Sequence, residues 1–374
     1  MNAVFPTSCA EGVVTHLRRL GVVACLALLP AGAASLTFAQ AAVPTVTNGA
    51  FDTRAASSGL ERTVNGFAAA VSPSWVGYVV DGIPGDHRAG DEYGGARCGT
   101  VYLEGRRTVE SGTVSEKAAT ASRPVAILLR VGTGAVQKIR TSPADCDLEA
   151  GGLAVHWLTG VDPSQSVAFL GRFVKVAEGA PSSQAPSWNS ALSAIALHAA
   201  PAAGSSLERF AAASQPVTIR KRAAFWLGAT RGAEGFAALR RYAEADSDDA
   251  FRKELPTALA VSGEAAAVDL LIKMARTDSN SEVRRQAIFW LGQKAGTKVA
   301  GTLADAATSD PEAAIKERAV FALSRLPNGE GVDKLIDLAR TNRDMAVRKR
   351  AIFWLSQSND PRALDYITTV LKGR

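Results

Sequence analysis

The sequence lacks the patterns that mark a catalytic or metal centre. It contains four histidines and four cysteines in 374 residues, and it has no H-E-x-x-H or G-x-S-x-G motif. Gly132-Thr133-Gly134 begins like a dinucleotide-binding loop, but Gln137 takes the place of the third glycine and the following residues are typical of a strand. We therefore predict no catalytic residue, no cofactor and no metal site.

A large excess of one charge is also missing. The chain has 42 Lys and Arg against 36 Asp and Glu, a net charge of +6. This balance is far from the dense cationic surface of a dedicated nucleic-acid-binding protein, so we predict no nucleic-acid partner. An apolar content of 47% and a charged content of 21% are typical of a chain that buries a core.

Long apolar runs are confined to the N-terminus. Arg18 and Arg19 precede a stretch rich in alanine and leucine, which ends in small residues at signal-peptidase spacing. A charged start, an apolar stretch and a small-x-small end are typical of a secretory signal peptide. We predict a signal peptide in residues 1–41, cleaved near Ala39 or Ala41, and a periplasmic or secreted protein.

Two other interpretations of this segment remain open. A transmembrane span is disfavoured, because Pro30 and Gly32 interrupt a run that is barely long enough. Residues 22–25 resemble a lipoprotein cleavage site with Cys25 as the lipidated residue, although few apolar residues separate Cys25 from Arg19. We predict no stable membrane span.

Export gives a meaning to the cysteines that remain after processing, Cys98 and Cys146. Two cysteines in an oxidising compartment usually pair, so we predict a disulfide between them. The alternative is a zinc site that adds His87 and His156. This alternative is weaker, because no paired C-x-x-C or H-x-x-x-H spacing is present.

The chain divides into two parts at residues 179–186, a small, uncharged, proline-bearing stretch typical of a linker. Residues 42–178 are mixed in pattern and rich in turns, which predicts a small α+β domain. Its aromatic segments, Trp75 to Tyr78 and His156-Trp157, belong either to a core or to a small pocket. The expected elements are strands at 100–103, 124–131 and 135–141, and a helix at 163–176 with Asp162 or Ser164 near its N-cap.

Residues 187–374 are dominated by an internal repeat. The segment 219–228 recurs at 283–292, 315–324 and 347–356, and 251–260 is a degenerate copy in the same register, so the period is 32 residues. A regular period of this length predicts a solenoid, here of six units with two helices each. Markers that keep the period are Leu207, Leu239, Leu271, Leu303, Leu335 and Ile367, and the residues that begin the next turn, Asp246, Asp278, Asp310 and Asn342.

The motif Val-Arg-x-x-Ala-x-x-x-Leu-Gly, seen at 283–292, followed by Ala-x-x-x-Leu resembles the short bacterial HEAT repeats, also called phycobilin-lyase-like. The resemblance to the repeats covers residues 187–374. The N-terminal part resembles a domain that is found with such repeats in exported bacterial proteins. The resemblance implies a mostly α-helical chain with a right-handed solenoid of helix pairs, preceded by the small α+β domain. It also implies a surface used mostly for protein–protein contact. A related enzyme, deoxyhypusine hydroxylase, needs His-Glu dipeptides for iron, and this chain has none.

One register position of the repeat is always cationic. In HEAT-like repeats such residues typically pair with acids of adjacent turns, which makes structural pairing the favoured interpretation over ligand binding. Exposed pairs of this kind would each contribute no more than about 1 kcal/mol. The cations are Arg220, Arg252, Arg284, Lys316 and Arg348, and the candidate acids are Asp248, Glu282, Glu312 and Asp344.

A second register feature combines aromatic and basic residues. Trp226, Trp290 and Trp354 are expected to face the core, whereas the phenylalanines before them lie about 120° away at 100° per residue. An open side would present a surface suited to an acidic or aromatic-rich partner, and the alternative is packing between repeats. We name this surface the aromatic–basic ridge: Lys221, Arg222, Phe225, Phe289, Phe321, Lys349, Arg350 and Phe353.

These observations predict an exported, non-enzymatic scaffold that binds a protein partner of unknown identity. The alternative from another class is an envelope enzyme, or its accessory subunit, with a small-molecule pocket in the N-terminal domain. An enzyme should show polar groups converging in a pocket around His156 or His87.

Overall fold

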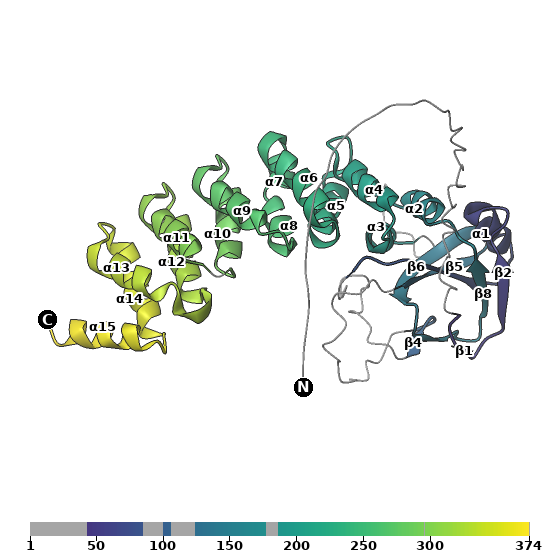
Figure 1. The fold of residues 1–374 in the computed structure, drawn as a ribbon, viewed down its shortest axis with the longest axis horizontal. Coiled ribbons are helices and arrows are strands. Elements are labelled where there is room, and N and C mark those ends of the chain that lie inside the picture. The colour runs from purple at the N-terminus through teal and green to yellow at the C-terminus, as the bar shows by residue number, and fades with distance from the viewer. Residues whose placement is uncertain (1–42, 85–99, 106–123, 177–185, 295, 374) are drawn as a thin grey trace, which may run out of the picture. The chain divides into compact units, whose positions relative to one another are not determined.

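The computed structural model describes residues 43–84, 100–105, 124–176, 186–294 and 296–373 (Figure 1). The predicted signal peptide, His87 and Cys98 lie outside these residues, and so does the predicted linker except Pro186. Within the described residues, no helix is long and apolar enough to cross a membrane.

The N-terminal region is built on a five-stranded sheet with the strand order β2-β8-β3-β5-β6. β5 and β6 form a hairpin, whose loop residues Thr133 and Gly134 both have positive φ, as a type I′ turn requires. Strand β8 pairs in parallel with both β2 and β3. The bounds are β2 (Phe51–Ala55), β3 (Ser74–Val80), β5 (Val125–Gly132), β6 (Ala135–Pro143) and β8 (Ala154–Thr159).

A second, parallel sheet has the order β1-β7-β4 and consists of short strands, β1 (Val46–Thr47), β4 (Thr100–Tyr102) and β7 (Asp147–Glu149). The large sheet is apolar on both faces. Successive side chains of a strand point to opposite sides, so a continuous apolar run such as that of β5 supplies both faces. In β5, Leu128 packs with residues of the small sheet, whereas Leu129 packs toward helices α1 (Leu60–Ala68) and α2 (Pro163–Gly171). The expected strands at 100–103, 124–131 and 135–141 are therefore confirmed.

The aromatic segments of this region belong to its core. Trp75, Tyr78 and Trp157 are each 0% exposed, so the packing interpretation is confirmed for them. Gly77 lies so close to Trp157 that a Cβ atom there would be 2.4 Å from the ring carbon Cζ3. Only a glycine permits this approach of strand β3 to the indole.

Helix α2 begins as predicted but ends early. Asp162 caps it by accepting a hydrogen bond from the Gln165 backbone N–H at 2.8 Å. The helix ends at Gly171 rather than at residue 176. Glycine is a poor helix former, and Val174 still reaches the hydrophobic core without helical backbone. The apolar residues beyond Gly171 are therefore explained by their burial and not by a continuing helix.

Residues 188–371 form successive helix pairs, which run from teal to yellow in Figure 1 and confirm the predicted solenoid. The first helix of each pair contacts the first helices of its neighbours. The pairs are α3 (Trp188–Leu197) with α4 (Pro201–Ala211), α5 (Val217–Thr230) with α6 (Gly232–Ala245), α7 (Asp249–Arg252) and α8 (Leu255–Val261) with α9 (Ala266–Thr277), α10 (Ser281–Leu291) with α11 (Thr297–Ser309), α12 (Ala313–Arg325) with α13 (Val332–Thr341), and α14 (Met345–Ser356) with α15 (Pro361–Leu371).

Two features of the repeat have a direct steric cause. The degenerate copy is split into α7 and α8 because Pro256 sits at the start of α8, where a missing backbone N–H is tolerated. The glycine of the Leu-Gly motif allows neighbouring first helices to approach closely. A Cβ on Gly228 would lie 2.0 Å from the Ala258 carbonyl oxygen, and one on Gly292 would lie 3.0 Å from the Ala322 Cβ.

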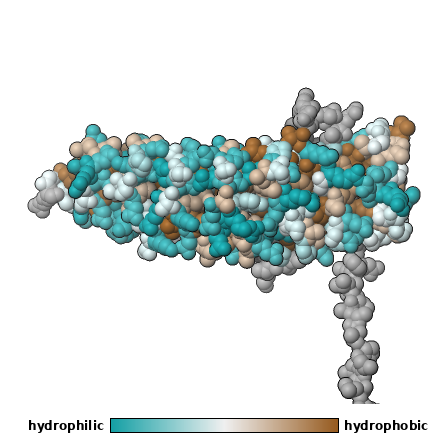
Figure 2. Space-filling model, turned by 90° about the horizontal axis from the view of Figure 1, so that it is seen from above, coloured by the Kyte–Doolittle hydropathy of each residue, from teal (hydrophilic) through white to brown (hydrophobic). Residues whose placement is uncertain are grey.

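The first helix pair is tied directly to the N-terminal region. The Ile83 N–H donates to the Leu197 carbonyl at 3.0 Å, and the Ala199 N–H donates to the Asp81 carbonyl at 2.8 Å. One hydrophobic core includes residues of the sheet, of α2 and of the solenoid. The division into two domains at 179–186 stays a prediction. The face seen in Figure 2 is mostly hydrophilic, with apolar residues in separate patches.

Candidate partner-binding surface

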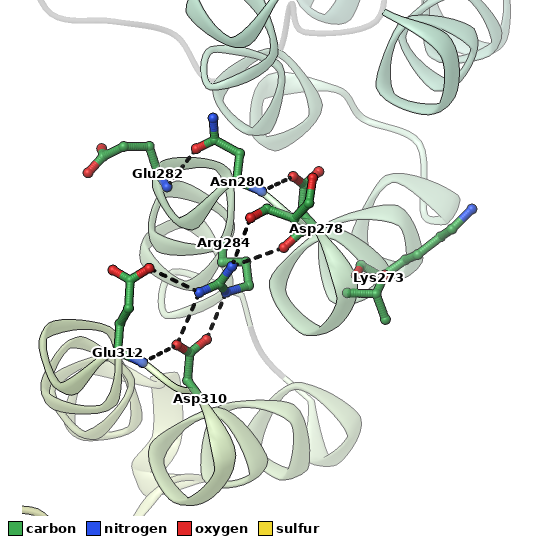
Figure 3. Close-up of polar contacts among 9 residues, drawn as sticks. Lys273, Asp278, Asn280, Glu282, Arg284, Asp310 and Glu312 are labelled. Atoms are coloured by element: carbon green, nitrogen blue, oxygen red, sulfur yellow. Dashed lines mark hydrogen bonds and ion pairs between the residues drawn. The ribbon is translucent and has the colours of Figure 1, made fainter. Parts of the chain in front are cut away.

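The cationic register position forms a ladder of ion pairs that joins successive units. Arg284 on α10 donates from Nε and Nη2 to the two carboxylate oxygens of Asp310, at 2.8 and 3.2 Å (Figure 3). Its Nη1 donates to the Asp278 backbone carbonyl at 3.0 Å, and Glu312 lies at 3.4 Å. One guanidinium thus joins the turn before its own helix to the turn of the next unit.

Related pairs occur in three other units, which confirms structural pairing for four of the five cations; Arg348 forms no ion pair with a described residue. Arg220 pairs with Asp246 and with Asp248, the latter at 2.9 Å. Arg252 pairs with Asp278 at 2.5 Å. Lys316 pairs with Asp344 at 3.4 Å.

Two details of the predicted ladder are wrong. For the three arginines the more buried acid is the aspartate that begins the next turn, 26 residues after the cation, which was not among the candidate acids. Three of the four candidates, Asp248, Glu312 and Asp344, do pair with ladder cations. Glu282 pairs instead with Arg285 of its own helix. The pairs of Arg220 and Arg284 are also not exposed, because these arginines are only 2% and 8% exposed. Burial raises the cost of breaking these pairs well above that of surface pairs.

The turn aspartates have a second role. Asp278 accepts a hydrogen bond from the Asn280 N–H at 2.9 Å, and Asp310 accepts one from the Glu312 N–H at 2.9 Å. Asn342 makes the same bond with the Asp344 N–H, also at 2.9 Å. These local bonds are why Asp or Asn recurs where each unit turns.

The aromatic–basic ridge lies on the first helices and is partly open. Phe225, Phe289 and Phe321 are half-buried. Phe353 is 48% exposed. Trp226 is 1% exposed, as expected for a core residue. Trp290 and Trp354 are half-buried.

Neighbouring units cover part of the ridge. The Arg318 guanidinium lies 5.0 Å from the centre of the Phe289 ring, and Phe321 contacts Trp354 with ring centres 5.0 Å apart. These are the inter-repeat contacts that the packing alternative predicted. Arg222 is covered as well: it donates to the Asn189 side chain at 2.8 Å, and burial lowers the pKa of its guanidinium.

On the first-helix face, the side of the solenoid formed by the first helix of each unit, basic side chains outnumber acidic ones. Three carboxylates on this face are all paired: Glu254 with Lys221, Glu282 with Arg285, and Glu317 with Arg350. Lys253 and Lys349 form no ion pair with any described residue, so the face retains an excess of positive charge. The prediction that the eight ridge residues bind a partner stays a prediction.

A buried polar network resembles part of a catalytic site but has no access to solvent. The Tyr78 hydroxyl lies 2.8 Å from Ser166 Oγ, which lies 2.8 Å from His198 Nε2. His198 Nδ1 donates to the Ala194 carbonyl at 2.7 Å, so Nε2 is the acceptor and Ser166 donates to it. Tyr78, Ser166 and His198 are each 0% exposed, and burial lowers the pKa of His198 to about 4. The network joins β3, α2 and α3 with a neutral imidazole.

His156 lies at a different place, on β8, where it is paired in register with Asp52 of the edge strand β2. Its Nδ1 lies 2.7 Å from Asp52 Oδ1, and its ring stacks on Phe67 at 4.1 Å. Burial acts to raise the pKa of Asp52, but hydrogen bonds from His156 and Arg54 outweigh it and lower this pKa overall. Among the described residues, no three His, Cys, Asp or Glu side chains converge as metal ligands.

Comparison with known proteins supports the prediction of HEAT-type repeats in the C-terminal part of the chain. Residues 205–292 and 300–373 match the family model of HEAT repeats. A search of curated sequences found no match.

Several solved structures resemble part of the chain, each with a TM-score below 0.5. The CpcE–CpcF complex of phycocyanin lyase from Nostoc is 24% identical, over 42% of this chain and 99% of that chain, with a TM-score of 0.32. Human deoxyhypusine hydroxylase is 15% identical, over 55% and 90%, with a TM-score of 0.28. The S. pombe condensin Cnd3–Cnd2 subcomplex is 16% identical, over 56% and 31%, with a TM-score of 0.37. Residues 205–292 and 300–373 of this chain are HEAT repeats.

Proposed function

We propose that the chain is an exported, non-enzymatic scaffold that binds an acidic protein partner through the aromatic–basic ridge. The observation that supports this most is the unbalanced charge of the first-helix face. Its carboxylates are all held by cations, whereas Lys253 and Lys349 form no ion pair with a described residue. An acidic partner would supply the missing charge and be steered to this face.

The phenylalanines add an apolar component to the same face. Half-buried rings such as Phe289 and Phe321 are already fixed by Arg318 and Trp354, so little side-chain entropy would be lost on binding. Aromatic anchors surrounded by cations are typical of the centre of a protein interface. Export rests on the charged and apolar N-terminal segment, and it places the partner in the envelope or outside the cell.

The test is cross-linking of the full chain in its native envelope, followed by mass spectrometry of the captured proteins. The ridge variant Lys349→Glu/Arg350→Glu is compared with the control variant Lys138→Glu/Arg240→Glu. The control changes two exposed cations away from the ridge that form no ion pair with described residues. We expect the ridge variant to reduce capture about tenfold or more, equivalent to about 1.4 kcal/mol, and the control to leave it unchanged.

Equal capture by the wild type and the ridge variant would exclude the ridge as the binding surface. Cross-links confined to residues 42–178 would favour a ligand-binding or enzymatic role in the N-terminal region instead. Circular dichroism of both variants checks that helicity is unchanged.

A further inference from the structure

Three crevices lie along the solenoid where one unit turns into the next. They have volumes of about 500, 320 and 570 Å³ and occupy the same place in successive units. Each includes one cation of the ladder: Arg252 in the first, Arg284 in the second and Lys316 in the third. Because the three crevices are periodic copies, their differences are informative.

In each of the first two crevices, a buried carboxylate neutralises the ladder cation. Asp278, whose side chain is 5% exposed, pairs with Arg252, and Asp310, also 5% exposed, pairs with Arg284. Each carboxylate comes from the turn of the next unit and takes up the charge of the guanidinium.

In the third crevice this carboxylate is missing. Asn342 stands at the register position of Asp310, and its Nδ2 donates to Thr308 Oγ1 at 3.1 Å. The carboxylate that Lys316 retains is Asp344, at 3.4 Å, with a side chain that is 37% exposed. The ladder cation is therefore less neutralised here than in the two crevices before.

Two further positions add positive charge to the third crevice. Lys334 stands where the preceding unit has Thr302, and Arg343 stands where it has Pro311. Neither cation forms an ion pair with a described residue. Asn342, Lys334 and Arg343 thus each make this crevice one unit more positive than its neighbour, and Thr308, which stands where the preceding unit has Arg276, makes it one unit less positive.

The acids that line the same crevice offset this only in part. Asp344 is used by Lys316, and Asp305 pairs with Arg276 at 2.8 Å. Asp337 is exposed and forms no ion pair with a described residue. The lining itself has three cations and three carboxylates. Because Arg276, which lies outside the lining, neutralises Asp305, one positive charge is left over.

We propose that this crevice, the Lys316 crevice, binds a carboxylate side chain from an acidic segment of a partner protein. The inference rests on the proposed function, because it gives the acidic partner a second, defined contact. The bound carboxylate would take the part that Asp278 and Asp310 play in the earlier units. A volume of about 570 Å³ leaves room for an acidic side chain and its backbone.

The direct probe is a fluorescein-labelled octaglutamate peptide, with octalysine as the opposite charge control, measured by fluorescence polarisation at low salt. Asn342→Asp restores the residue that the array uses at Asp246, Asp278 and Asp310, so this variant is compatible with the fold. Ser279→Asp adds the same charge at an exposed turn position beside an already neutralised pair. We expect Asn342→Asp to weaken octaglutamate binding at least tenfold and Ser279→Asp to change it less than twofold.

Equal weakening by the two variants would show only general electrostatics and overturn the inference, and so would a lack of octaglutamate binding by the wild type. Partner capture separates this inference from the proposed function. If Asn342→Asp leaves both octaglutamate binding and capture unchanged while the ridge variant loses capture, the Lys316 crevice is excluded and the scaffold remains. If the ridge variant keeps capture while Asn342→Asp abolishes peptide binding, the ridge is excluded and the crevice remains.

Discussion

Arg284→Met removes the central cation of the best-defined ladder pair and leaves Asp310 without its partner. The Arg284 and Asp310 side chains are 9% and 5% exposed, so the remaining carboxylate is nearly buried. Removing one member of a buried ion pair destabilises a protein by about 3–5 kcal/mol. We expect a loss in this range, including the hydrogen bond to the Asp278 carbonyl.

The chain offers a matched control in Arg276→Met. Arg276 pairs with Asp305 at 2.8 Å, a similar distance, but the two side chains are 47% and 64% exposed. An exposed pair contributes about 0–1 kcal/mol, so this variant should be nearly as stable as the wild type. The comparison isolates burial as the cause of the difference.

A double variant, Arg284→Met/Asp310→Asn, tests the mechanism further. Asparagine keeps the turn, as Asn342 does in the following unit, and it removes the buried charge. We expect it to recover part of the stability, leaving a loss of about 1–2 kcal/mol from missing hydrogen bonds. Urea unfolding gives the free energies, and amide hydrogen exchange in α10 and α12 shows whether the loss is local. A loss for Arg284→Met no larger than that for Arg276→Met would refute the reasoning.

The remaining predictions concern His198 and the cysteines. Because burial lowers the folded-state pKa of His198 to about 4, the unfolded chain binds a proton below its ordinary pKa of 6.5 that the folded chain does not. Stability should therefore fall by about 3 kcal/mol between pH 6.5 and pH 4, and urea unfolding of His198→Gln should lack this part of the decline; identical pH profiles would contradict it. For Cys98 and Cys146, intact mass of protein from the envelope should rise by about two hydrogens on reduction, and two free thiols in native material would exclude the disulfide.

The solenoid was predictable from sequence because each unit has the same neighbours. A helix pair that packs against copies of itself needs the same residue at the same register, so Leu239, Leu271 and Leu303 recur at one interval and are all 0% exposed. The β5–β6 hairpin was predictable for a local reason, its Gly-Thr-Gly turn. Both signals lie within a short stretch of chain or repeat along it.

Features that depend on distant, unrepeated contacts were not predictable. The insertion of β8 between β2 and β3 pairs residues about a hundred positions apart. The Tyr78–Ser166–His198 network joins three single residues with no shared pattern. The turn aspartates did carry a signal, since Asp246, Asp278 and Asp310 follow the ladder cations at one interval, but the burial that makes them strong partners of arginine appears only in the structure.

Departures from the period are the positions to examine for binding. A residue that keeps the period is explained by packing, as the buried pairs of Arg252 and Arg284 are. A residue that breaks it is not required by the fold, because the neighbouring units fold with another residue there. Asn342 breaks the period at one crevice, where three earlier units have aspartate, and the loss of this carboxylate makes that crevice more positive. Because three earlier units fold with aspartate at this position, packing does not require its loss at Asn342, whereas an acidic ligand would favour that loss.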